Sequence, residues 1–523
     1  MSSILKSTSI VAVSTLASRI LGFIREMLFA AFFGVTGATD AFFVAFRIPN
    51  LLRRLVAEGA LTISFIPVYT EYIVNKGESE ALILAQKTLS ILLVALLIFT
   101  GLGMIFSPEI VKAFAFGLTG EGTIVTAENL TRLMFPYLIL VGLTAFAMGV
   151  LNSRGFFFSS AFSPVLLNVG IISGILSGYY IFKNGLYGPA VGVLFGGILQ
   201  LFFQIPYMIR TGFKLKFSFD VNHPGIKKIF GMLTPALFGI AVYYINIQMS
   251  TLLASFLPAG SISYIYYSDR LTELTLGIFI VSIGSVILPE MSKLSASDNF
   301  DKLKELYLKA VKAALFLAIP AACALFVIGL PIVTVFFERG KFTSYDSMMT
   351  YRALICSILG LISLSVLRIT TPTFYSLKDT RNPVKTALVA FILNISLGYI
   401  LMNTELKHAG LQLANSISVT VQMLLLIVIL NRKINGLHFR KIIPSILKTV
   451  LSSAVMGVFL YFVSGLIDWK VSSIILKVSF LAVNVIGGCM VFFIIAYLLK
   501  VEEVKYLTDR IRKKWNSGIK KNA

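Results

Sequence analysis

The chain has 523 residues, of which 57% are hydrophobic and 13% are charged, and its mean hydropathy is +0.87. A soluble globular protein carries about 25% charged residues, so this composition excludes that class. The net charge of +22 would suggest a nucleic-acid partner in a soluble chain, but cytoplasmic loops of membrane proteins are also rich in Lys and Arg. The sequence therefore predicts an all-α, polytopic membrane protein whose partners include membrane lipids and no nucleic acid.

Apolar runs recur along the whole chain, and about fourteen of them are long enough for the roughly 20 residues of helix that cross a bilayer. Arg19 and Arg25 lie inside the first run, so we expect a retained helix there rather than a cleaved signal peptide. The predicted spans are 5–33, 39–73, 82–106, 124–151, 159–182, 187–210, 226–256, 261–292, 305–337, 347–376, 383–403, 409–431, 443–467 and 472–499.

The distribution of basic residues predicts the orientation. Connections after even-numbered runs hold most of them, for example Lys214 and Lys216, whereas the connections at 34–38 and 257–260 hold none. Because Lys and Arg accumulate on the cytoplasmic side, both termini are expected to be cytoplasmic.

The chain also shows signs of an internal repeat. The second run reaches Pro67 near its end and the eighth reaches Pro289 in the same relative place. This matches two six-helix lobes, 1–210 and 211–432, followed by two further helices and a basic tail in 433–523. Paired repeats in membrane proteins commonly move against each other in alternating access.

Charged residues interrupt the first two runs. An arginine at the centre of a bilayer costs about 2.5–3.5 kcal/mol even on a lenient scale, so these residues must face water, an anion or a carboxylate. The basic residues outnumber the nearby acids: they are Arg19, Arg25, Arg47, Arg53 and Arg54, against Glu26, Asp40 and Glu58. In the eighth run, Asp269, Arg270 and Glu273 lie on adjoining turns.

Two interpretations of these charges remain open. Arginine binds a diphosphate well because its planar fork donates two parallel hydrogen bonds, which predicts a site for an anion or an anionic amphiphile. Alternatively, buried Arg–carboxylate pairs lock the helices together. Glu26 has the same two roles open to it, as a gate that substrate displaces or as a fixed partner of Arg25.

Enzyme chemistry finds little support in the sequence. No P-loop, H-E-x-x-H or G-x-S-x-G element is present, and the cysteines show no metal-binding spacing. We therefore expect neither a catalytic residue, a metal nor a cofactor. The three histidines lie in loops or at run ends, and the three cysteines lie in apolar runs: His223, His408, His438, Cys323, Cys356 and Cys489.

Several segments resemble the MurJ (MviN) lipid II flippases of the multidrug/oligosaccharidyl-lipid/polysaccharide exporter superfamily. They are SRILGFIRE at 18–26, ATDAFFVAFRIPNLLRRLVAEGA at 38–60, YYSDRLTE at 266–273, GKFTSYDSMMT at 340–350 and FYSLKDTRNPVK at 374–385.

The resemblance implies a carrier of the bacterial cytoplasmic (inner) membrane that moves lipid II from the inner to the outer leaflet. It implies two six-helix lobes around a cationic cavity, with helices thirteen and fourteen forming a lipid-tail groove. The family's cavity arginines would be Arg19, Arg25, Arg53 and Arg270, with Glu26, Asp40, Glu58 and Asp269 as charge partners or gate residues. Contact with cell-wall synthesis proteins is a further expectation.

Some family members resemble sodium-coupled transporters with aspartates in helices seven and eleven, where this chain has only Asn246 and Asn394. The alternative function is a drug or cation antiporter, or another polysaccharide-lipid exporter, of the same superfamily. An integral-membrane glycosyl or phosphoryl transferase is a further alternative. An antiporter favours acids over arginines in its cavity, and a transferase needs a catalytic constellation that the sequence lacks.

Overall fold

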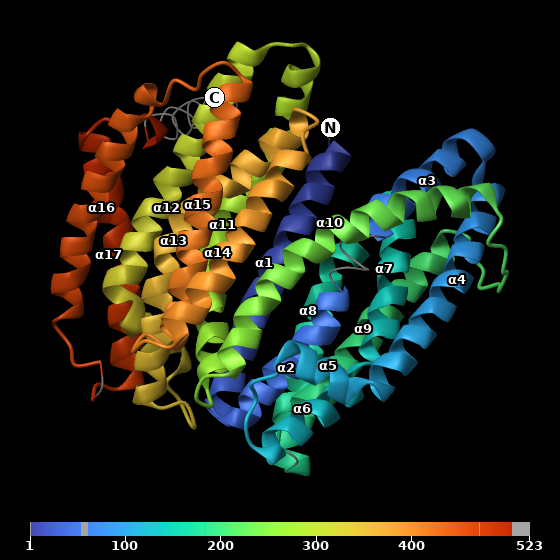
Figure 1. Ribbon diagram of the computed structural model, residues 1–523, viewed down its shortest axis with the longest axis horizontal. Coiled ribbons are helices and arrows are strands. Elements are labelled where there is room, and N and C mark those ends of the chain that lie inside the picture. Colours follow the sequence, from blue (N-terminus) through green and yellow to red (C-terminus); the bar gives the residue numbers. More distant parts are fainter. Residues whose placement is uncertain (1, 54–60, 184, 470, 505–523) are drawn as a thin grey trace, which may run out of the picture. The chain divides into compact units, whose positions relative to one another are not determined.

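The computed structural model describes residues 2–53, 61–183, 185–469 and 471–504, and these residues form helices and connections without a β-strand (Figure 1). A backbone in hydrocarbon must satisfy its own hydrogen bonds, which favours helices wherever an apolar run crosses the membrane. The helices are α1 (Ser2–Phe33), α2 (Gly37–Arg53), α3 (Leu61–Lys76), α4 (Glu78–Ile105), α5 (Ser107–Phe114), α6 (Glu121–Met134), α7 (Tyr137–Ser153), α8 (Phe157–Ser177), η2 (Gly178–Phe182), α9 (Tyr187–Arg210), α10 (Pro224–Ser255), α11 (Ser261–Ala296), α12 (Phe300–Phe337), α13 (Ser344–Ser376), α14 (Arg381–Met402), α15 (His408–Lys433), η3 (Phe439–Lys441), α16 (Ile443–Ser464) and α17 (Ile474–Leu498).

Each predicted span overlaps one helix or two consecutive helices, which confirms the all-α membrane fold. Within the described residues, ten helices are long and apolar enough to cross a membrane, so the exact number of fourteen stays a prediction. The predicted spans outside these ten are 5–33, 39–73, 226–256 and 261–292, three of which hold the candidate arginines.

Prolines shape several of the helices. The predicted span 124–151 is divided between α6 and α7, where Pro136 follows the last residues of α6. In α12, Ile328 has non-helical φ and ψ of −109° and 16°, three residues before Pro331. Proline removes a helix hydrogen bond and clashes with the preceding turn, so breaks at these positions are expected.

Contacts divide the chain into two compact units. Unit 1 comprises 1–263 and 339–342, and unit 2 comprises 264–338 and 343–523. In unit 1, α1 packs on α8, and α8 on α9; in unit 2, α12, α13, α14 and α15 pack side by side, with α16 and α17 against α12 (Figure 1). The predicted boundaries at 210/211 and 432/433 stay a prediction.

Glycines bring α8 and α9 into close contact. A Cβ added at Gly170 would lie 2.3 Å from the Cα of Gly196, and one at Gly174 would lie 2.4 Å from the carbonyl oxygen of Gly188. Apolar side chains gain little from contact with each other inside lipid, so helices there depend on close backbone approach at small residues. These glycines therefore let the backbones of α8 and α9 approach each other directly.

Replacing Gly174 with leucine is expected to destabilise the protein by at least about 1–3 kcal/mol, because the added side chain overfills a packed interface. Gly101→Leu in α4 is the matched control, since a Cβ at Gly101 has no neighbour within 4 Å. Thermal unfolding in detergent, followed by size-exclusion chromatography, would measure both variants. Equal melting temperatures would contradict the packing argument.

Asp379 organises the connection between α13 and α14 within the 374–385 segment. It accepts hydrogen bonds from the Asn382 backbone amide at 3.1 Å and from Lys433 Nζ at 2.6 Å. Burial alone would raise the pKa of this carboxyl, but the bonds from Lys433 and Asn382 outweigh it and lower the pKa to about 2. Asp379 therefore stays charged at neutral pH and ties the start of α14 to the end of α15.

Candidate functional site

Arg25 on α1 contacts Asn168 and Glu26 within unit 1. One guanidinium nitrogen donates to Asn168 Oδ1 of α8 at 3.0 Å, and the other donates to Glu26 Oε1. The side chains of Arg25 and Glu26 are only 14% and 4% exposed, and the guanidinium lies 5.9 Å from the centre of the Phe46 ring. The structure thus places the predicted pair Arg25–Glu26 in contact and holds the guanidinium in position.

Asn168 is a site residue that the sequence interpretation missed. Besides accepting from Arg25, its Nδ2 donates to the Ser18 carbonyl oxygen at 3.0 Å, so it links α8 to two turns of α1. Asn168 is buried, and a polar side chain inside the apolar run of 159–182 is itself a signal for function, because burying it in a membrane helix is costly.

Arg19 on α1 and Arg53 on α2 are the other candidate arginines of unit 1. Arg19 is half-buried, and no hydrogen bond or ion pair joins it to another residue of the described part of the chain. Arg53 Nε donates to Asn50 Oδ1 at 3.0 Å, one turn earlier in α2. Arg54 and Glu58, which completed the predicted group, lie outside the described residues.

In unit 2, Arg270 is half-buried on α11. Its guanidinium donates to Glu273 Oε2 at 2.7 Å and lies 4.6 Å from the centre of the Tyr266 ring. The adjacent Asp269 accepts a hydrogen bond at 2.7 Å from Gln412 Nε2 of α15. Gln412 is buried and was also missed by the sequence interpretation.

Asp40, at the start of α2, is buried with 3% exposure. Its carboxylate accepts hydrogen bonds from the Gly260 amide at 2.6 Å, the Ser263 amide at 2.8 Å and the Ser263 hydroxyl at 2.5 Å. We call Asp40, Gly260 and Ser263 the Asp40 cluster. A carboxylate at the N-terminus of α11 satisfies backbone amides and complements the helix dipole. The cluster joins the start of α2 to the start of α11, which the sequence separates by more than two hundred residues. The groups that bind the Asp40 carboxylate there are two backbone amides and a hydroxyl.

A second contact joins segment 339–342 to the end of α1, again within unit 1. The Lys341 amide donates to the Ala31 carbonyl oxygen at 2.9 Å. Gly34 and Gly340 have φ of +63° and +58°, and a Cβ at Gly34 would lie 2.5 Å from the Lys341 carbonyl oxygen. Only glycine suits this backbone and this close approach.

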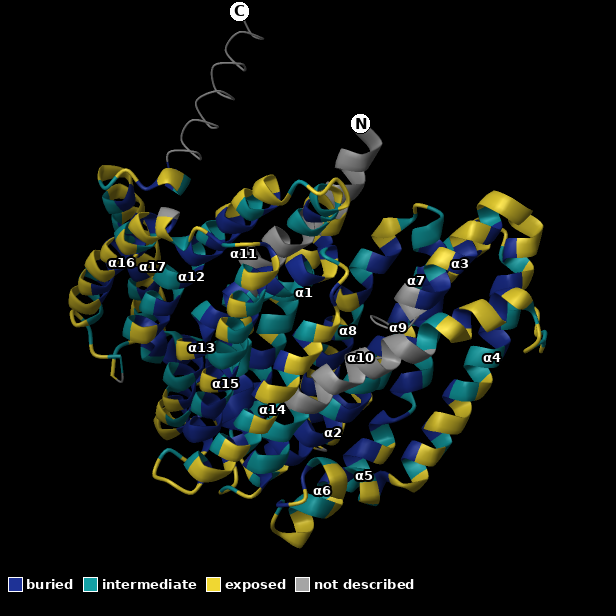
Figure 2. Cartoon of the chain, turned by 45° about the horizontal axis from the view of Figure 1, so that its top comes forward, coloured by how far each residue is buried: buried dark blue, intermediate teal, exposed yellow. Residues whose placement is uncertain are grey.

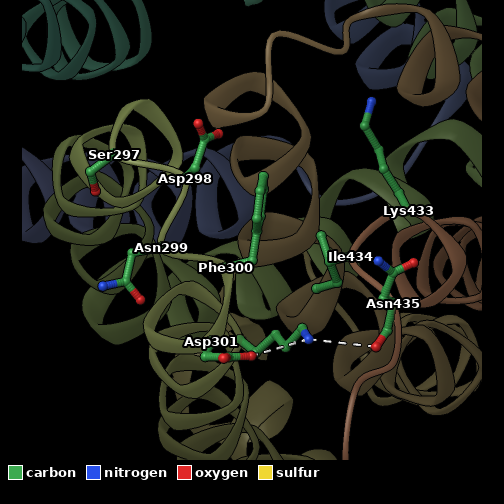
Figure 3. Close-up of a pocket in the computed structure, with 9 residues that line it drawn as sticks. Ser297, Asp298, Asn299, Phe300, Asp301, Lys433, Ile434 and Asn435 are labelled. Atoms are coloured by element: carbon green, nitrogen blue, oxygen red, sulfur yellow. Dashed lines mark hydrogen bonds and ion pairs between the residues drawn. The ribbon is translucent and has the colours of Figure 1, made fainter.

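A polar pocket of about 500 Å³ lies at the connection between α11 and α12 (Figure 3). Lys304 Nζ lies 3.4 Å from Asp301 Oδ1 there, and the Asp301 side chain is 95% exposed. The pocket contains none of the predicted arginines, so it does not match the predicted anion site. Its lining residues are Ser297, Asp298, Asn299, Phe300, Asp301, Lys304, Lys433, Ile434 and Asn435.

Coordination of a metal would need several ligating side chains together. Among the residues that the structure describes, no three His, Cys, Asp or Glu side chains gather in this way. Asn394, at one of the two predicted sodium-site positions, is buried on α14, and the side chain of Asn246 at the other lies outside the description.

Comparison with known proteins gives a consistent result. A family described as "Lipid II flippase MurJ" matches residues 29–480. The probable lipid II flippase MurJ of Vibrio cholerae is 35% identical over 481 residues, with 90% of each chain covered. The lipid II flippase MurJ of Burkholderia cenocepacia is 34% identical over 424 residues, covering 80% of this chain and 82% of that protein.

Solved structures agree with these relatives. A lipid II flippase MurJ in an inward closed conformation superposes with a TM-score of 0.80 at 28% identity, covering 94% of this chain and 99% of that one. An inward-facing MATE-family multidrug transporter superposes with a TM-score of 0.68 at 14% identity, covering 81% and 98%, and it shares the fold alone. The chain is a multi-pass membrane protein and belongs to the lipid II flippase MurJ family.

Proposed function

We propose that this protein moves lipid II, the undecaprenyl-diphosphate-linked peptidoglycan precursor, from the inner to the outer leaflet of the bacterial cytoplasmic membrane by alternating access. The observation that supports this most directly is the Arg25 site, a guanidinium held by Asn168 and Glu26 inside an apolar helix pair. A fixed cation at that depth suits a lipid-linked diphosphate, whose charge must be compensated as it crosses the membrane. The process moves a molecule and needs no covalent step, so we propose a transporter without catalytic chemistry.

The diphosphate would be bound by Arg19, Arg25, Arg53 and Arg270. Arginine forms charge-assisted, bidentate bonds to phosphate oxygens, which strengthen where water is scarce. Glu26 would pair with Arg25 until the diphosphate displaces it, and substrate would then change the balance between two states through its different affinity for each. The competing role for Glu26 is a fixed partner that offsets the burial of Arg25.

Glu26→Gln separates these two roles because it keeps the shape of the side chain and removes its charge. If Glu26 is a gate residue, the variant should change how strongly substrate alters cysteine cross-linking between the Asp40 region and residues 260–263. An unchanged cross-linking yield, with and without lipid II, would leave Glu26 as a fixed partner.

The Asp40 cluster and the 31–341 contact would keep the outer side closed. In both contacts backbone amides donate to an oxygen near a helix end, the Asp40 carboxylate in one and the Ala31 carbonyl in the other. Water can replace these hydrogen bonds when the helix ends separate. Helices α16 and α17, in the predicted 433–523 segment, would hold the lipid tail, and cell-wall synthesis proteins would supply or receive lipid II beside the transporter.

Depletion of this protein in its host is expected to cause accumulation of lipid II in the inner leaflet while synthesis of the precursor continues. Leaflet-specific labelling or enzymatic degradation of lipid II from outside the cell would measure this. If the depleted host still carries the normal amount of lipid II in the outer leaflet and retains more of a cationic drug, the result would instead support an antiporter. The matched test in the absence of other cell proteins measures lipid II movement by the purified protein in vesicles that contain lipid II.

We also propose that both termini and the 211–225 connection are cytoplasmic, while 34–38 and 257–260 face outward. The argument is the concentration of Lys and Arg on one side of the chain. Single cysteines in these connections, in a variant lacking Cys323, Cys356 and Cys489, should react with an impermeant maleimide in intact cells only at the outward positions. Labelling at 211–225 but not at 34–38 would reverse the orientation.

A further inference from the structure

The connection between α9 and α10 exposes an unusual row of apolar side chains. Residues 213–220, all of which the structure describes, form neither helix nor strand. Alternate positions carry large apolar side chains that are mostly exposed: Leu215 is 68% exposed, Phe217 55%, Phe219 64% and Val221 61%. Water alone would be a costly environment for four such groups in one short segment.

The same connection is held firmly against α4. Ser90 Oγ accepts from the Ser218 amide at 2.9 Å, Gln86 donates to the Lys214 carbonyl oxygen at 2.8 Å, and Lys87 Nζ lies 2.8 Å from Asp220 Oδ2. The Lys87 hydrogen bond also holds the pKa of Asp220 below its usual range. Ser218 and Asp220 are therefore bound to α4, whereas Phe217, Phe219 and Val221, which alternate with them, remain exposed.

The attachment lies where α4 changes from polar to apolar. Glu78 and Glu80 begin the helix, whereas the residues from 91 to 106 include no charged side chain. In Figures 1 and 2 the connection runs beside this part of α4. Since α4 is long and apolar enough to cross a membrane, this change marks the boundary between water and hydrocarbon.

The charge of the connection suits an anionic surface. Lys214 and Lys216 of the connection, and Lys227 near the start of α10, are exposed. Within the described part of the chain no acidic side chain pairs with them. Asp220, the one acid of the connection, is already paired with Lys87. Basic residues next to membrane helices are attracted to anionic headgroups, and apolar side chains beside them enter the headgroup–acyl boundary.

We propose that residues 213–221 form an interfacial anchor that binds the anionic lipid surface of the leaflet into which this connection faces. Leu215, Phe217, Phe219 and Val221 enter the boundary region, and Lys214, Lys216 and Lys227 contact the headgroups. The lipid surface is the occupant because the connection is tethered at the depth where α4 meets the headgroups. This anchor concerns bulk phospholipid and does not depend on which lipid is transported.

The test uses the full-length protein with Trp469 and Trp515 replaced by phenylalanine, so that one new tryptophan reports alone. Phe217→Trp and Phe219→Trp are reconstituted in vesicles of phosphatidylcholine with and without phosphatidylglycerol, and quenching by lipids brominated near the headgroup is measured. The matched control is Thr119→Trp in the exposed connection between α5 and α6. Bromine quenching at 217 and 219 should exceed that at 119 by at least about twofold, because these side chains enter the boundary region.

A further variant, Lys214→Ser with Lys216→Ser, separates the charge from the apolar row. It should lower quenching in anionic vesicles to the level in neutral vesicles. Equal quenching at 217, 219 and 119, together with equal access of aqueous iodide, would overturn the anchor. Quenching that never differs between neutral and anionic vesicles would overturn the role of the lysines. The vesicles contain no other protein. If this segment instead binds a partner protein, quenching at 217, 219 and 119 should therefore be equal.

Discussion

Replacing Arg25 with alanine is expected to impair lipid II movement strongly while the protein remains folded and inserted. Each charge-assisted hydrogen bond to a phosphate contributes about 1.5–3 kcal/mol, so loss of one bond should weaken substrate binding about 10- to 150-fold. Arg53→Ala and Arg270→Ala should behave alike. Complementation of a depleted host and lipid II movement in vesicles are the two measurements.

Arg25→Lys tests the chemistry more finely. Lysine keeps the positive charge beside Glu26 but loses the planar fork that binds two oxygens, so we expect partial activity and normal folding. Arg25→Ala also removes the ion pair with the buried Glu26 carboxylate, and this loss lowers stability for a reason unrelated to substrate.

Arg154→Ala is the matched control for burial. The Arg154 side chain is 13% exposed, close to the 14% of Arg25, and it pairs with Glu78 at 3.6 Å near the ends of α7 and α4. If the melting temperature of Arg154→Ala is close to that of the unaltered protein, this variant should still move lipid II. Full complementation by alanine at Arg25, Arg53 and Arg270 would refute the proposed anion site.

Replacing Asp40 with alanine is expected to open the outer side and to stop transport. The change leaves the buried amides of Gly260 and Ser263 without an acceptor, and each such loss costs about 1–3 kcal/mol. The closed state would therefore lose about 2–6 kcal/mol relative to a state in which water reaches these groups, enough to change its population at least about thirtyfold. Asp40→Asn should have a smaller effect in the same direction, since an amide keeps one acceptor oxygen.

Cysteines at Ala31 and Lys341, joined by a short bis-maleimide in a variant without native cysteines, report whether segment 339–342 stays beside α1. Cross-linking should decrease in Asp40→Ala and should not change in Asp301→Asn, a carboxylate whose side chain is 95% exposed. Undiminished cross-linking in Asp40→Ala, with transport lost, would show that Asp40 acts on substrate rather than on closure.

The sequence by itself determined the membrane class and the approximate helix ranges, because hydrocarbon permits few backbone structures other than a helix along an apolar run. It also singled out Arg25 and Glu26, since a charge at membrane depth is costly wherever the neighbouring helices lie. These inferences depend on composition and distance along the chain, which a sequence contains in full.

Only the tertiary structure decided which distant groups meet. Asn168 lies 143 residues from Arg25, and Ser263 lies 223 residues from Asp40; no periodicity links such positions. Those contacts depend on which helices pack side by side, as α8 does with α1 and, through its glycines, with α9. The short helix α5 and the attachment of 213–220 to α4 escaped prediction for the same reason, because packing energies between helices are not expressed in local sequence.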